Sequence, residues 1–318
     1  MLQRSCILVV LFLVMHPQSM FSSADETKLT SEELVARHLE AIGSAAARSA
    51  VKTRVVQGSA VYAPIVGGGG RVEGKTGLVS EGHKLRFMMK FNQGDYRGEN
   101  VVFNGSAMGL AFATSNQSRS VFGAFLSSQD AIVREGLLPG VLSTAWPLLD
   151  IENRKPKIIL EGLKRIDGTA AYQVRYLPHK HSDLQILLYF DQETFRHIKS
   201  VYSLDVGNNV GPSITESIRL QADRTTLEEW FSDFQTIDGL TLPSHWKIHF
   251  TRELPNGATT VTEWDLKEDE VTHNMRCSRQ SRDSSRPMRP HASRMWIRGS
   301  QRMSLWKLIG DTRDQARN

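Results

Sequence analysis

Apolar and more polar side chains alternate one by one through much of the chain, a period typical of half-buried strands. One such run has apolar residues at every second position: Leu85, Phe87, Met89 and Phe91. The same pattern recurs at 172–176, 184–190 and 246–250. Asn-Gly or Asp-Gly pairs at 104–105, 167–168, 238–239 and 256–257 lie between these runs and favour tight hairpin turns. Short strands joined by hairpins predict an antiparallel meander.

Two stretches have helical spacing instead. Thr30 and Glu33 fit a capping box, and an apolar helical face follows before Gly43. This pattern predicts a first helix after Thr30, and the Ala-rich residues 44–51 predict a second short one. Between 118 and 150 apolar residues are frequent without alternation, and Pro139-Gly140 divides this stretch into two predicted helical pieces.

These patterns predict an α+β fold that is mainly β. We expect a strongly curved antiparallel sheet with helices from both stretches covering its concave side. The space enclosed by a concave face rich in Leu, Phe, Met and Trp must either be filled by the protein's own side chains or hold an apolar ligand. The candidate lining residues are Leu85, Phe87, Met89 and Phe91, with Met88 and Met108 as further adaptable liners. Plain core packing is the competing interpretation of each of them.

The amino terminus has the features of an export signal. Arg4 precedes an uncharged apolar run over residues 6–15, which is too short to span a bilayer. Ser22 and Ala24 are the small residues expected before a cleavage site. We therefore predict that residues 1–24 are a cleaved signal and that the product is periplasmic or secreted. Cys277 is then the single cysteine of the mature chain, which excludes an intramolecular disulfide.

The charge is unevenly distributed. Residues 272–318 carry 11 Lys and Arg against 3 Asp and Glu, whereas residues 25–271 carry 27 against 31. The formal net charge of +5 therefore comes from the tail, whereas residues 25–271 have a slight excess of acidic residues. Residues 25–271 form the predicted folded domain. The tail could be a basic nucleic-acid arm. Because it has no sustained periodicity, we favour a disordered basic segment and expect no nucleic-acid partner.

One segment matches a nucleotide-binding motif. Residues 69–76 fit the pattern G-x-x-x-x-G-K-[ST]. That motif binds phosphate only where a helix begins directly after the loop. Here residues 77–82 are strand-like and begin and end with glycine. We therefore predict a glycine-rich hairpin loop and no nucleotide partner.

The remaining candidates for chemistry are histidine and glutamate pairs. His179 and His181 are one residue apart, and His245 and His249 share one strand face, but neither pair has further ligands at a diagnostic spacing. Glu228 and Glu229 are adjacent and would point to opposite faces of a strand. No nucleophile motif is present. The sequence predicts no catalytic residue, no metal site and no cofactor.

Over about residues 31–270 the chain resembles the periplasmic lipoprotein-carrier superfamily of Gram-negative bacteria. The stretches that carry the resemblance are residues 36–43, 85–91, 167–172, 188–194, 231–234 and 237–243. The resemblance implies an incomplete β-barrel with a helical lid, whose apolar cavity receives lipoprotein acyl chains. It also implies a functional arginine on an early strand. Arg54 lies in that region and is a candidate polar cavity residue.

From the resemblance we expect a non-enzymatic carrier or envelope sensor. Its partners would be the acyl chains of lipoproteins or another lipid, together with a protein of the cell envelope. An exported scaffold with a filled core is the alternative, and a metal-dependent hydrolase using His179 and His181 is a third. Lipid that co-purifies with the protein would separate the first two, and stoichiometric zinc would favour the third.

Overall fold

A computed structural model describes residues 29–92, 96–111, 120–180, 182–206, 223–254 and 256–275. The predicted signal at 1–24, His181, Cys277 and the tail from residue 276 lie outside the described residues. The helices are α1 (Ser31–Ile42), α2 (Ala45–Ala50), α3 (Val121–Ser128), α4 (Ala131–Arg134) and α5 (Ile151–Arg154), with 3-10 turns η1 (Gly140–Leu142) and η2 (Pro147–Asp150). None of the described helices is long and apolar enough to cross a bilayer.

The described strands form one antiparallel sheet. They are β1 (Thr53–Val66), β2 (Val72–Glu81), β3 (Lys84–Phe91), β4 (Gly98–Phe103), β5 (Met108–Ala111), β6 (Lys157–Ile166), β7 (Thr169–Leu177), β8 (Gln185–Asp191), β9 (His197–Val206), β10 (Asp223–Ile237), β11 (Leu240–Glu253) and β12 (Thr259–His273). Their order is β5-β4-β3-β2-β1-β12-β11-β10-β9-β8-β7-β6. Pairing of β1 with β12 joins two meanders, while β5 and β6 remain as edges, so the barrel is incomplete, as predicted.

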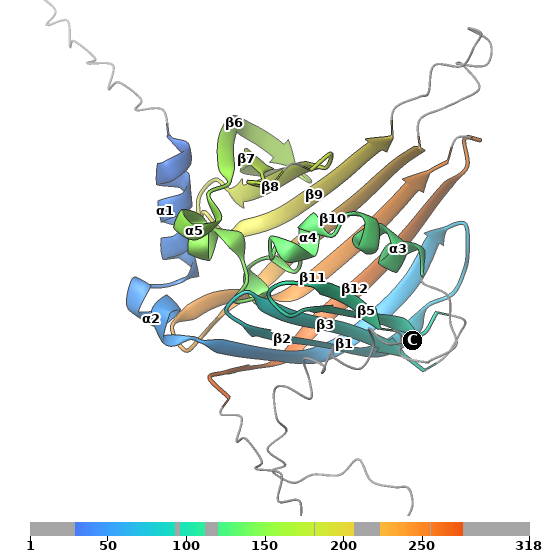
Figure 1. Cartoon of the computed structure of the whole chain (residues 1–318), viewed down its shortest axis with the longest axis horizontal. Helices are drawn as coiled ribbons and strands as arrows, with labels where there is room; N and C mark the ends of the chain where they lie inside the picture. The colour runs from blue at the N-terminus through green and yellow to red at the C-terminus, as the bar shows by residue number, and fades with distance from the viewer. Residues whose placement is uncertain are drawn as a thin grey trace, which may run out of the picture.

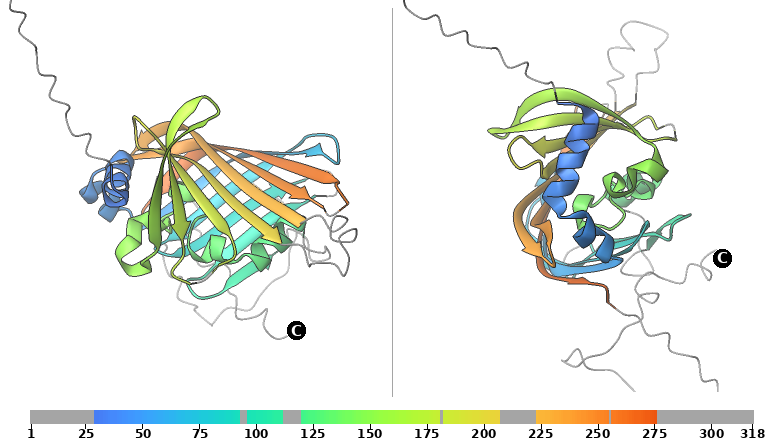
Figure 2. Two further views of the ribbon diagram at one scale, coloured as in Figure 1. Left: turned by 90° about the horizontal axis from the view of Figure 1, so that it is seen from above. Right: turned by 90° about the vertical axis from the view of Figure 1, so that its left-hand side faces the viewer.

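The helical segment, residues 121–154, connects the two edge strands and lies over the concave face of the sheet (Figure 1). Figure 2 shows the sheet curving around this segment. Its apolar residues share one buried cluster with the inner faces of the strands. The members from the helical segment are Phe122, Phe125, Leu126, Ile132, Val133, Leu137, Leu138, Val141, Leu142, Trp146 and Leu148. The core of the protein therefore lies between the sheet and this segment.

The helical segment is more broken than the sequence indicated. The predicted break at Pro139-Gly140 is present, because α4 ends before it and η1 begins at Gly140. The prediction of only two helical pieces is wrong, because the segment consists of three α-helices and two 3-10 turns. Gly136 has φ +72°, and a Cβ there would lie 2.0 Å from the carbonyl oxygen of Ala145. Gly140 has φ +59°, with Phe231 2.8 Å from the position of a Cβ. Both glycines leave the helical region where the chain packs tightly, so a continuous helix cannot form.

The first helix follows the predicted pattern. The Thr30 side chain accepts from the Glu33 amide, and the Glu33 carboxylate accepts from the Thr30 amide, which confirms the capping box. Gly43 ends the helix with φ +152°, and a Cβ there would lie 2.4 Å from the carbonyl oxygen of Gly239. The second predicted helix is confirmed as α2, although none of its residues is buried.

The turns and the carboxyl end complete the sheet. All four Asn-Gly and Asp-Gly pairs connect neighbouring strands, and in two of them both residues have positive φ, as primed hairpin turns require.

Strand β12 continues to His273, beyond the boundary at 271 that we expected from the sequence. Asn274 then accepts from the Lys52 amide and donates to the Ala50 carbonyl, at 2.8 Å in each case. The carboxyl end of the sheet is thereby attached to the end of α2.

Candidate functional site

The predicted lining residues form the inner face of β3. Leu85, Phe87, Met89 and Phe91 are each at most 1% exposed. The intervening residues are half-buried or exposed and face the other side of the sheet. The assignment of Met88 to the lining is therefore wrong. Met108 is half-buried and packs against the core.

Side chains fill the interior that these four residues face. The ring of Phe87 lies 4.8 Å from that of Trp246 on β11, and the ring of Phe91 lies 5.5 Å from that of Tyr96. The two hollows described below are lined by other residues. In this closed arrangement the four predicted lining residues pack as core residues.

Arg54 connects the sheet to the helical segment. It lies on β1, is 3% exposed, and its Nη1 donates to the Val141 carbonyl in η1 at 2.6 Å. Burial lowers the pKa of Arg54 to about 10. Arg54 Nε donates to His273 Nε2 at 3.2 Å, so Nδ1 of this histidine carries the proton and donates to Asp238 at 2.9 Å. A buried cation therefore ties η1 to the sheet through a main-chain carbonyl.

A hollow of about 610 Å³ opens beside Arg54. Its walls come from the end of α1, from α2, from β1 and β2, and from the helical segment. Arg48, Lys52 and Arg54 supply positive charge to the lining, whereas Glu81 is its one carboxylate. Arg48 is held by the main-chain carbonyls of Leu39 and Gly43. The hollow combines apolar walls with a net positive charge.

A second contact fastens the helical segment to α1. Trp146 Nε1 donates to His38 Nε2 at 3.0 Å, so His38 Nδ1 carries the proton and donates to the Phe195 carbonyl at 3.0 Å. Burial lowers the pKa of His38 to about 4, despite the Phe195 bond, which raises it. The ring of His197 stacks on Trp146 with centroids 4.6 Å apart. This contact requires a neutral His38.

A third contact anchors the amino end of α3. Glu99 on β4 is 2% exposed and accepts from Tyr96 Oη at 2.9 Å and from the hydroxyl of Ser120, the N-cap of α3. Burial raises the pKa of Glu99, while these two donors lower it. Tyr96 Oη in turn accepts from Trp264 Nε1 at 3.2 Å. The helical segment is therefore held to the sheet at η1 and at the start of α3, and to α1 just before η2.

Glu229 is a buried acid on the inner face of β10. It is 0% exposed, whereas the adjacent Glu228 faces outward and pairs with Lys199 at 2.8 Å, which confirms the predicted opposite orientation. Tyr202 Oη donates to Glu229 Oε2 at 2.7 Å. Burial raises the pKa of Glu229 to about 8, although Tyr202 and Trp246 both lower it. The alternation of Leu227, Glu229 and Phe231 is the sequence signal that places this acid in the core.

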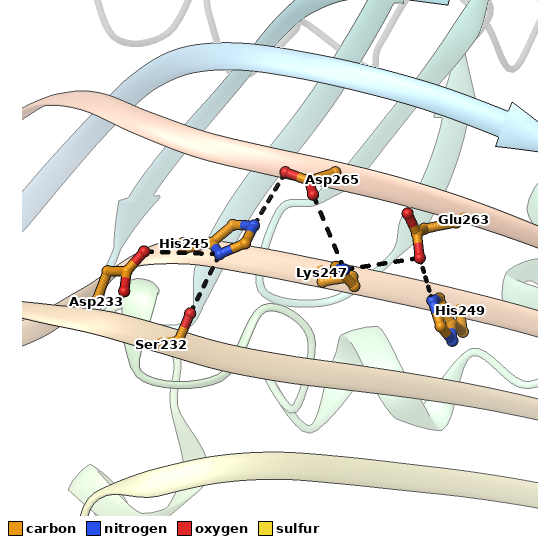
Figure 3. Close-up of polar contacts among 7 residues, drawn as sticks. All are labelled: Ser232, Asp233, His245, Lys247, His249, Glu263 and Asp265. Atoms are coloured by element: carbon orange, nitrogen blue, oxygen red, sulfur yellow. Dashed lines mark hydrogen bonds and ion pairs between the residues drawn. The ribbon is translucent and has the colours of Figure 1, made fainter. Parts of the chain in front are cut away.

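The outer face of β11 carries the second histidine pair. His245, Lys247 and His249 face away from the helical segment and contact carboxylates of neighbouring strands (Figure 3). The closest pairs are His245 Nε2 with Asp265 Oδ1 at 2.9 Å, and His249 with Glu263. Within the described ranges, no three His, Cys, Asp or Glu side chains are placed to hold a metal ion. These contacts are cross-strand polar contacts of a kind that stabilises sheets.

A second hollow, of about 780 Å³, lies on this outer face. Trp230 lies in it with its indole N–H donating to Asp167 at 3.2 Å, and Lys199 Nζ lies 4.2 Å from its ring centroid. His249 contacts the same ring edge-on at 4.6 Å. The indole of Trp230 therefore already contacts side chains of this protein on its N–H and around its ring.

The remaining predicted features lie away from these contacts. His179 is exposed just after β7, and the other histidine of that pair is outside the described residues. In the segment that matches the nucleotide-binding motif, β2 begins at Val72 and runs through Lys75, so the predicted strand after the glycines is confirmed. The loop therefore has no helix amino terminus to receive a phosphate.

No protein-family profile and no curated protein matches this chain. Among solved structures it is similar to a LolA superfamily protein from Nitrosomonas europaea, with 15% identity, a TM-score of 0.41 and coverage of 76% of this chain and 94% of the other. An outer membrane lipoprotein-sorting protein domain from Vibrio parahaemolyticus has 11% identity, a TM-score of 0.41 and coverage of 77% and 94%. A Pseudomonas aeruginosa MucA/MucB complex has 11% identity, a TM-score of 0.22 and coverage of 76% and 98%.

Proposed function

We propose that this chain is a non-enzymatic, exported binding protein that holds an acyl chain of a lipid or lipoprotein between its curved sheet and its helical segment. In this proposal the inner face of β3, with Leu85, Phe87, Met89 and Phe91, lines the acyl site. Arg54 controls access to it. An envelope protein that delivers or receives the acylated cargo would be a further partner.

The contact between Arg54 and the Val141 carbonyl carries this proposal. A buried guanidinium is costly unless it is well paired, and here a main-chain carbonyl of η1 holds its Nη1. A hydrogen bond to a charged group contributes about 1.5–3 kcal/mol. Such a bond is strong enough to keep the helical segment closed and weak enough to be exchanged for contacts with a ligand.

The hollow beside Arg54 supplies the route into the interior. Val141 and Leu240 belong both to its lining and to the buried core cluster. Displacement of η1 would therefore join the hollow to the apolar interior. The acyl chain would enter beneath η1, and Arg48 and Lys52 at the mouth would attract an acidic head group.

The test is binding of a fluorescent long-chain fatty acid to wild type, Arg54→Leu and Arg86→Leu. Removal of the Arg54 bond destabilises the closed form, and a loss of at least 1.4 kcal/mol should tighten binding about tenfold or more. Arg86 is a matched control, because its Nε donates to Asn100 within the sheet at 3.0 Å and Arg86→Leu leaves η1 in place. If Arg54→Leu does not fold, Arg54→Lys, which keeps the charge, replaces it and should show a smaller increase.

Absence of binding by wild type and by the Arg54 variants would overturn the proposal in favour of a scaffold with a filled core. If wild type and Arg54→Leu bind the fatty acid with equal affinity, Arg54 does not control access to the site. The lining is tested separately with a fatty acid that carries a photoreactive group at the end of its chain. We expect cross-links to residues 84–91. Cross-links confined to the outer hollow around Trp230 would contradict the proposed site.

A further inference from the structure

Five buried side-chain polar atoms of the described residues have no hydrogen-bond partner, and two of them lie on neighbouring strands in the interior. Glu229 Oε1 and Trp246 Nε1 are both fully buried, and neither has a hydrogen-bond partner. Buried polar groups are nearly always paired, because an unpaired one retains its full desolvation cost. Two such atoms near each other therefore indicate a place where a further polar group fits.

The two residues lie side by side on the inner face. In the register of β10 and β11, Phe231 is opposite Trp246 and Glu229 is opposite Ile248, so Glu229 is the diagonal neighbour of Trp246. Diagonal neighbours on one face are within reach of long and aromatic side chains. The indole N–H of Trp246 lies close enough to the Glu229 carboxyl to lower its pKa. The two groups are nevertheless outside hydrogen-bond geometry.

The pair borders both the proposed acyl site and η1. The ring of Trp246 lies 4.8 Å from that of Phe87, a proposed lining residue. Its other neighbour, Phe231, contacts Gly140 at the start of η1. A ligand that enters beneath η1 would therefore reach Glu229 and Trp246 before its chain extends along β3.

Both unpaired atoms are donors. Burial raises the pKa of Glu229 to about 8, so the carboxyl is mostly protonated at neutral pH. Tyr202 Oη donates to Oε2, which leaves the acid proton to Oε1, the unpaired oxygen. The indole N–H can only donate. Two donors in an apolar surrounding fit a group that only accepts.

We propose that Glu229 and Trp246 form the polar end of the acyl site, where the carboxyl and the indole N–H donate to the carbonyl oxygen of an acyl ester or amide. This inference rests on the proposed function and narrows its ligand class from hydrocarbon chains in general to carbonyl-bearing acyl chains. A plain hydrocarbon would leave both donors unpaired. Sites built to bond a polar group reject analogues that lack it.

The experiment measures displacement of the fluorescent fatty acid by a long-chain methyl ester, the matching N-methyl amide and an n-alkane with the same number of heavy atoms. For wild type we expect the ester and the amide to bind about ten- to a hundredfold more tightly than the alkane. Glu229→Leu and Trp246→Phe should each reduce this ratio about tenfold. Glu229→Gln, which keeps a donor, should retain most of it.

Glu228→Gln is the control, because this neighbouring acid points to the outer face and the variant should leave the ratio unchanged. Circular dichroism checks that each variant folds, and Glu229→Gln and Trp246→Phe suffice if Glu229→Leu does not. Equal affinity of wild type for ester and alkane, or a ratio unaffected in Trp246→Phe and Glu229→Leu, would overturn this inference alone. Failure of wild type to bind any probe would instead overturn the proposed function.

Discussion

The buried carboxyl of Glu229 makes the stability of this protein depend on pH in a direction that can be derived from the structure. Burial raises its pKa to about 8 from the usual 4.5. Between these two pH values the unfolded chain carries an ionised Glu229, whereas the folded protein carries a protonated one. Folding therefore takes up a proton, and the free energy of unfolding falls as pH rises through this range. Replacement of Glu229 by Gln, which is neutral at every pH, removes this dependence.

The size of the effect follows from the interval between the two pKa values. The interval spans about 3.5 pH units at 1.36 kcal/mol each, so Glu229 destabilises the folded protein by up to about 5 kcal/mol at pH 8 relative to pH 4.5. For a domain of this size, 1 kcal/mol changes the melting temperature by about 2–4 °C. Glu229→Gln should therefore melt about 10 °C or more above wild type at pH 8. The two proteins should become closer as pH decreases.

The assay is urea unfolding of wild type and Glu229→Gln at half-unit steps from pH 4.5 to 9, followed by circular dichroism. Burial also raises the pKa of Glu268, to about 7, and that of Glu99, but both residues are present in both proteins. The difference between the two curves therefore isolates Glu229. It should grow from pH 4.5 to 8 and then become constant. Parallel curves would refute the reasoning, because Glu229 would then be ionised or hydrated in the folded protein.

Four further predictions concern other parts of the chain. His38 should by itself destabilise the folded protein by up to about 3 kcal/mol as pH falls from 6.5 to 4, because the unfolded chain protonates His38 before the folded protein does; the difference in urea-unfolding free energy between wild type and His38→Phe should change by this amount over that range, and a constant difference would contradict it. Deletion of residues 276–318 should leave the melting temperature unchanged within about 2 °C, whereas deletion from Asn274 should lower it by about 2–6 °C through its lost hydrogen bonds. A calorimetric titration should detect no Mg-ATP binding by wild type or Lys75→Ala, because a strand follows the loop; micromolar binding lost in the variant would be the contrary result. Amino-terminal sequencing of the exported protein should begin at Asp25, and recovery of Met1 would contradict the export signal.

The sequence by itself determined the local structure and the class of fold. Alternation at every second residue places Leu85 and Phe87 on one face of a strand wherever that strand pairs, because the pleat repeats every two residues. The Asp-Gly pairs predicted hairpin turns, since these residues tolerate positive φ. The capping box at Thr30 is likewise complete within one turn of helix. Each signal concerns the backbone geometry of a few consecutive residues.

The contacts of the candidate site were decided only by the tertiary structure. Pairing of β1 with β12 brings Arg54 beside His273, and the curvature of the sheet brings Arg54 to the carbonyl of Val141. The acid at Glu229 was visible in the sequence, but its pKa depends on burial beneath a segment distant in the chain. The spacing of residues along the sequence predicts which face of a strand or helix each side chain occupies. Which faces meet depends on the pairing of strands far apart in the chain and on the helical segment closing over them, and these long-range contacts are set by the burial of the whole core at once.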